Sequence, residues 1–67
     1  MANFKQQRQQ IGISQSRLAR LSGVSRFNIC CSELGQRLLT DDERTRIRSA
    51  LKMEITRMRA VMSELRV

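Results

Sequence analysis

Residues 13–29 constrain the fold of this 67-residue chain most strongly, because they read as two short helices joined by a tight turn. Ser14 and Ser25 each stand where a helix would begin, and a serine there can accept a hydrogen bond from an otherwise unpaired backbone N–H. Gly23 stands where the first helix would end, and glycine takes the left-handed φ of such an end with little strain. The pattern predicts two helices held at a fixed angle.

The rest of the chain also indicates helices. It has no proline and only two aromatic residues, and its β-branched residues are scattered, which gives strands little support. Thr40 and Glu43 form a capping-box pattern, after which nothing interrupts a helix to the end of the chain. The sequence therefore predicts an all-α fold with a long C-terminal helix. The three shorter helices are expected over residues 3–10, 15–21 and 26–34.

The C-terminal helix carries a stripe of apolar residues spaced alternately by four and three. The stripe consists of Leu51, Ile55, Met58, Met62 and Leu65. Such a heptad seam favours packing against a second copy of the chain, as in a coiled coil. The alternative is a helix that bends near Lys52 and folds back on its own domain. Residues 1–51 are expected to form one domain, and residues 52–67 a helix for dimerisation or for closure of the bundle.

Charge points to a polyanionic partner. Thirteen Lys and Arg residues stand against six Asp and Glu, a net charge of +7. Residues 1–40 hold six basic side chains and one acidic, a net of +5, whereas residues 41–67 hold seven and five, a net of +2. A basic surface attracts nucleic acid, and neutralised phosphates release counterions. A chain this short also has a marginal core, for which oligomerisation is one remedy.

The chain lacks the residues that several classes of protein need for their function. Cys30 and Cys31 are adjacent and form no disulfide framework, and without histidine no familiar zinc site can be assembled. No apolar run is long enough for a membrane span, and residues 1–10 are too polar for a signal peptide. No nucleophile–base pair or phosphate-cradling glycine loop is present. We expect a cytoplasmic protein with reduced thiols that is no enzyme and needs no cofactor or metal.

Several matches at fixed spacing carry a resemblance to a known family. They are Ile13-Ser14-Gln15, Leu18-Ala19, Gly23-Val24-Ser25, Ile29 and Glu33-x-Gly35. The segment from about Phe4 to Leu51 resembles the helix-turn-helix domain of the phage-repressor and Cro (XRE-type, lambda-repressor-like) DNA-binding proteins. The resemblance implies a compact bundle of four or five helices. It also implies that residues 1–51 bind double-stranded DNA and that the chain is a sequence-specific transcription regulator at the nucleoid. It further implies a repressor from a phage or other mobile element, which binds a palindromic operator as a homodimer.

The resemblance also implies which residues contact DNA. By position they are Gln15, Ser16, Ser25, Arg26, Phe27, Asn28 and Cys31, to which Arg17 and Arg37 add positive charge toward the DNA backbone. Residues 26–34 would be the recognition helix, with Arg26 suited to a bidentate contact with guanine and Phe27 to a thymine methyl. Gln15 would bond a phosphate, and Asn28 would lie near a phosphate or a base edge.

Periodicity and resemblance disagree over the third helix. Phe27, Cys30, Cys31 and Leu34 are spaced i, i+3, i+4 and i+7, which by itself predicts the buried stripe. The resemblance instead buries Ile29 and turns Phe27 and Cys31 outward, and we adopt it because the turn residues and Ile29 fix the register together. The alternative function is a protein-interaction module, antitoxin-like, that uses the apolar surface of Phe27, Cys31 and Leu34. A DNA-bending architectural protein ranks lower, since no flexible basic arm or hairpin wing is visible.

Overall fold

The computed structural model describes residues 4–65, which form four α-helices and no strand. The helices are α1 (Phe4–Gln10), α2 (Gln15–Ser22), α3 (Arg26–Glu33) and α4 (Asp41–Leu65). The all-α prediction and the long C-terminal helix are confirmed. Relative to the expected bounds, α2 is one residue longer and α3 one residue shorter, while positions 3, 66 and 67 lie outside the described residues.

The turn and cap residues adopt the local structures that their chemistry predicts. The hydroxyls of Ser14 and Ser25 each accept a hydrogen bond from a backbone N–H three residues on, at 3.0 and 3.1 Å. Gly23 ends α2 with a φ of +77°. Thr40 and Glu43 exchange hydrogen bonds of 3.0 and 3.1 Å before α4, which confirms the capping box. Local side chains therefore define where each of these helices begins or ends.

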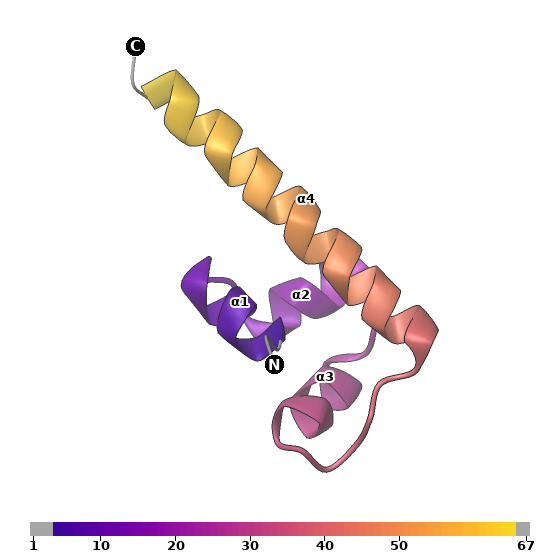
Figure 1. Cartoon of the computed structure of the whole chain (residues 1–67). Coiled ribbons are helices and arrows are strands. Elements are labelled where there is room, and N and C mark those ends of the chain that lie inside the picture. The colour runs from indigo at the N-terminus through magenta and orange to yellow at the C-terminus, as the bar shows by residue number, and fades with distance from the viewer. Residues whose placement is uncertain (1–3, 66–67) are drawn as a thin grey trace.

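The core is built from residues of α2, α3, α4 and their connections. Its buried members are Ile13, Leu18, Val24, Ile29, Leu39, Ile47, Ala50 and Leu51. Phe4, Ile11 and Ala19 pack against it and are partly buried. Figure 1 shows α1 and α2 beside the first half of α4, with α3 lying beyond α2, far from the C-terminus. In the connection before α4, Leu39 is buried and Leu38 is exposed.

The second half of α4 projects beyond the other three helices (Figure 1). α4 is one continuous helix of 25 residues, so the chain does not fold back near Lys52. Its apolar stripe becomes progressively exposed, from half-buried Ile55 and Met58 to Met62 at 64% and Leu65 at 79%.

One residue of the predicted dimer seam is placed differently. Leu51 is buried in the chain's own core, so the surface open to a second copy begins at Ile55. The same spacing serves both roles, because a core-facing stripe and a coiled-coil seam differ little in period. No helix within residues 4–65 has both the length and the apolar composition needed to cross a membrane.

α3 buries the side that the resemblance predicts. Ile29 is 0% exposed and belongs to the core, whereas Phe27 is 74% exposed. Leu34 is also exposed, and Cys30 and Cys31 are half-buried. The prediction from periodicity alone is therefore wrong for this helix. Eight residues make barely two turns, and the turn at Gly23 sets which side meets the core.

Candidate nucleic-acid interface

The exposed part of the predicted interface comes from the first turns of α2 and α3. Ser16 lies in the first turn of α2, and Ser25, Arg26 and Phe27 are consecutive at the start of α3; all four are exposed. Cys31 follows one turn later and is half-buried. Among residues 4–65 no carboxylate pairs with Arg26, so its guanidinium is available to an external acceptor. The surface thus combines one free cation, an aromatic face and small hydroxyls.

Glu33, the last residue of α3, ties three helices together. Arg8 of α1 donates two hydrogen bonds of 2.9 Å to its carboxylate, and Gln15 of α2 donates a third of 3.0 Å. Only 3% of the Glu33 side chain is exposed. Burial opposes ionisation of this carboxyl, but the donors from Arg8 and Gln15 outweigh it and hold the pKa of Glu33 below its usual range. Gln15 is therefore directed at Glu33 in the free chain.

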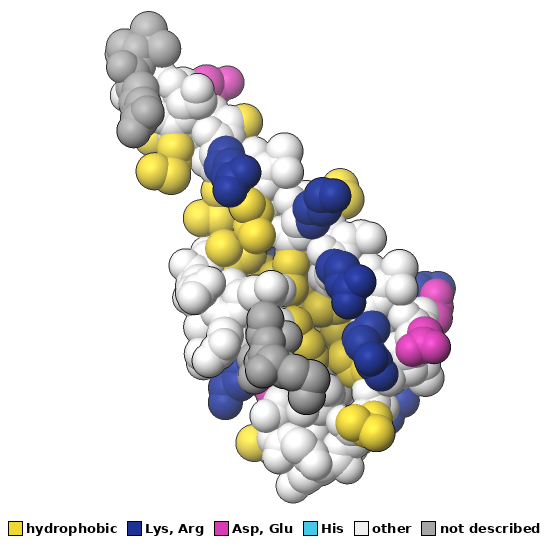
Figure 2. Space-filling model, viewed as in Figure 1, with side chains coloured by type: hydrophobic (Ala, Val, Ile, Leu, Met, Phe, Trp, Pro, Cys, Tyr) yellow, Lys and Arg dark blue, Asp and Glu magenta, His cyan; other side chains and the backbone are white. Residues whose placement is uncertain are grey.

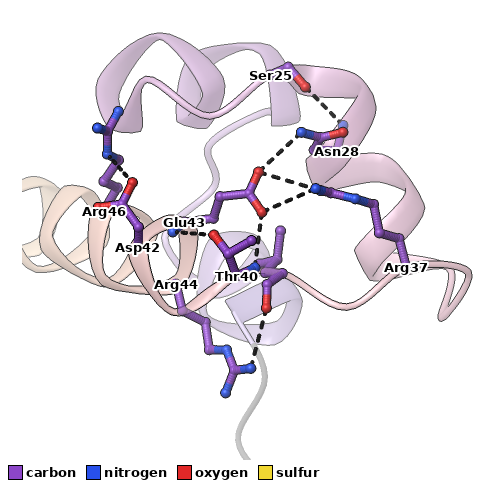
Figure 3. Close-up of polar contacts among 9 residues, drawn as sticks. Ser25, Asn28, Arg37, Thr40, Asp42, Glu43, Arg44 and Arg46 are labelled. Atoms are coloured by element: carbon purple, nitrogen blue, oxygen red, sulfur yellow. Dashed lines mark hydrogen bonds and ion pairs between the residues drawn. The ribbon is translucent and has the colours of Figure 1, made fainter.

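Glu43, in the first turn of α4, gathers groups from α3 and the connection that follows it (Figure 3). The Asn28 amide donates to its carboxylate at 3.1 Å, and Arg37 approaches both oxygens at 3.4 Å. The backbone N–H of Thr40 is the main reason that the pKa of Glu43 lies below its usual range, with Arg37 and Asn28 adding to the effect against partial desolvation. This cluster holds the end of the α3 connection against α4.

Glu54 is a buried carboxylate on the core side of α4. Arg57, one turn on, donates to it at 2.6 and 3.2 Å, and Arg17 of α2 reaches it at 3.2 and 3.4 Å. The hydrogen bonds from Arg57 chiefly, and those from Arg17, hold the pKa of Glu54 below its usual range despite desolvation. Arg17 keeps 40% of its side chain exposed while it makes this pair.

The predicted interface residues thus divide into two groups. Those held by carboxylates in the free chain are Gln15, Arg17, Asn28 and Arg37. Sequence reasoning used Glu33 only as a match to the resembled family, treated Glu43 only as a cap, and missed Glu54. For Glu54 a signal exists, because it continues the buried face of α4 in helical step with Ile47 and Ala50.

Within residues 4–65 no group of three or more His, Cys, Asp or Glu side chains is placed to hold a metal ion. Comparison of the chain with protein-family models, with curated proteins and with solved structures finds no match. The function is therefore inferred from the chain's own residues and geometry.

Proposed function

We propose that this chain is a sequence-specific DNA-binding transcription regulator that inserts α3 into the major groove. The support is chemical and geometric: a basic chain of net charge +7, a short exposed helix behind a glycine turn, and an unpaired arginine at its start. A helix of this kind fits the major groove, where arginine reads guanine through O6 and N7. Such a regulator acts at the nucleoid in the cytoplasm, and in the family it resembles it is a repressor.

The observation that carries the proposal is the opposite exposure of Phe27 and Ile29. Because Ile29 is enclosed by the core, Phe27 on the opposite side of α3 faces outward, and Arg26 at the start of the helix is exposed as well. An arginine and an aromatic ring one position apart can contact neighbouring bases, the first by hydrogen bonds and the second through a thymine methyl. Ser16 and Ser25 beside them carry hydroxyls suited to phosphate oxygens.

Dimerisation belongs to the same proposal. The stripe of Ile55, Met58, Met62 and Leu65 leaves the body of the domain and is increasingly exposed toward its end. A second copy packed on the outer part of this stripe, from Met58 to Leu65, would cover that part and present two copies of α3 to a two-fold symmetric site. The two half-sites would be centred about 34 Å apart, one turn of the duplex.

The test is a titration against selected DNA. Duplexes enriched from a random pool by the wild-type chain are compared with scrambled duplexes by fluorescence anisotropy at several salt concentrations. We expect a preference of about 1,000-fold or more for the enriched duplex and an affinity that falls steeply with salt. Equal affinity for both duplexes, or an affinity that salt does not change, would contradict the proposal.

A second candidate function is supported by the apolar part of the same surface. Phe27 of α3 and Leu34, just past the end of that helix, are large, apolar and exposed, which is unusual for a surface that only reads DNA. A protein partner could cover them instead. Substitution Phe27→Ala separates the two functions: it weakens binding of the enriched duplex if α3 reads DNA, and leaves that binding unchanged if the ring serves a protein.

A further inference from the structure

A groove between α1 and α4 lies apart from the proposed DNA-binding surface. It has a volume of about 400 Å³ and an apolar floor formed by Ile11, Leu51 and Ile55. One rim is formed by Gln7 and Gln10 of α1. The other rim belongs to α4. The groove is thus lined by two elements that the proposed DNA contact does not use.

The α4 rim is cationic. Arg48, Lys52 and Arg59 line the groove and are exposed. Figure 2 shows Lys and Arg side chains in a row along α4, beside a band of hydrophobic surface. Among residues 4–65 no carboxylate forms an ion pair with any of these three cations, although three other arginines of α4, namely Arg44, Arg46 and Arg57, do form one. Three unpaired cations therefore border an apolar floor.

We propose that this groove is the docking site for an acidic amphipathic helix of another protein. From Arg48 to Arg59 the rim spans about 16 Å, or three helical turns. A partner helix laid along it would place apolar side chains at i, i+3 or i+4 and i+7 on the floor, which is the usual helix-in-groove pattern. Asp and Glu residues on one flank of that helix would face the three cations, and this charge complementarity sets the choice of partner.

Two other occupants fit less well. The free apolar segment of a second copy of this chain is the end of α4, whose residues 57–65 contain Arg57, Arg59 and one acid, Glu64. Its net positive charge opposes a cationic rim. A DNA backbone would match the cations but presents no apolar surface to cover Ile11 and Ile55.

The experiment titrates the full-length chain with two synthetic helical peptides of 14 residues by isothermal calorimetry. The first has leucine at i, i+3 and i+7 and glutamate along one flank; its twin has lysine in place of each glutamate. We expect the glutamate peptide to bind at least tenfold more tightly than its twin. The double variant Lys52→Glu/Arg59→Glu should lose that binding at least tenfold and favour the lysine peptide instead. Both positions are exposed, and circular dichroism checks that the variant folds.

A matched variant, Arg20→Glu/Arg26→Glu, makes the same change of net charge on α2 and α3, away from the groove. It should bind the glutamate peptide within twofold of the wild type while losing the enriched DNA duplex, so that the groove and the DNA surface can fail separately. Equal binding of the two peptides, or equal loss in both variants, would overturn the proposal. Two further results would also overturn it. One is that duplex DNA displaces the peptide from the Arg20→Glu/Arg26→Glu variant. The other is that the wild-type chain forms a dimer which the Lys52→Glu/Arg59→Glu substitutions dissociate.

Discussion

Phe27 and Ile29 lie two positions apart in α3 and face opposite environments: Phe27 is 74% exposed, and Ile29 is 0% exposed within the core. This relationship orients the whole helix, because a side chain two residues from a buried one points to the far side. It leaves Phe27 exposed in the first turn of α3, where Arg26 is exposed too. The proposed function depends on that orientation.

The two positions should separate stability from binding. Ile29→Ala removes a fully buried side chain and should lower the free energy of unfolding by about 2–4 kcal/mol. Phe27→Ala should change it by less than about 0.5 kcal/mol, since the ring is exposed. It should nevertheless weaken binding of the enriched duplex about tenfold. Urea titration and anisotropy measure the two effects. A large loss of stability in Phe27→Ala would show that α3 buries the other side.

The apolar end of α4 should control the oligomeric state. Replacing Met58 and Met62 with glutamate places charges on the proposed dimer seam. The change should convert dimers to monomers, which light scattering measures as a halved mass. Affinity for a duplex with two half-sites should then fall about 100-fold, because the second half-site no longer binds intramolecularly. The matched control, Met53→Glu/Ala60→Glu, puts two charges on exposed positions that face away from the seam. Equal dissociation by both variants would show that the seam is not the contact.

Acid should destabilise the fold through three glutamates. The pKa values of Glu33, Glu43 and Glu54 are lowered in the folded chain, so the unfolded chain binds more protons in the acid range. Their contribution is complete above the unfolded pKa of about 4.3 and is lost as pH falls through the lower folded values. The urea midpoint should therefore decrease steadily below about pH 4.5. The Glu33→Gln variant should be less stable at pH 7, and its urea midpoint should decrease less steeply with falling pH. A decrease as steep as in the wild type would show that Glu33 does not contribute to the acid destabilisation.

Glu54 should limit how strongly Arg17 contacts DNA. In the free chain its carboxylate holds the Arg17 guanidinium at 3.2 Å. Glu54→Gln removes that competing charge and should let Arg17 pair with a phosphate. The slope of log affinity against log salt should steepen by about 0.9, the value for one more phosphate contact. Glu64→Gln removes the same charge from an exposed position on the projecting end of α4 and should leave the slope unchanged. Identical slopes in both variants would mean that Arg17 does not reach the backbone.

Local chemistry could be predicted from the sequence, whereas long-range pairing could not. Ser14, Ser25, Gly23 and the Thr40–Glu43 box act on neighbours within a few residues, so their effects are visible in the chain itself. Glu54 pairs with Arg17 across 37 residues, and no local pattern links them. Some arginines that the sequence leaves free to bind phosphate are already paired with carboxylates of the same chain. For Arg17, only the packing of α2 on α4 reveals this pairing.

Hydrophobic periodicity alone was also insufficient to predict which residues are buried in α3 and α4. In α3 the i, i+3, i+4, i+7 stripe of Phe27 and Leu34 is exposed, because the fixed turn presents Ile29 to the core instead. In α4 the seam begins as core at Leu51 and becomes surface by Met62. The sequence pattern is continuous there, and what changes is whether α1 and α2 are alongside.

The most direct test of the central claim is to repeat the duplex selection with Arg26→Ala. If Arg26 reads a guanine, the variant should enrich the same half-sites and spacing but lose base preference at one position in each half-site. The loss should equal about 1–3 kcal/mol of discrimination against the wrong base. An enriched sequence identical to that of the wild type at every position would contradict the account, because the outward surface of α3 would then not be reading DNA.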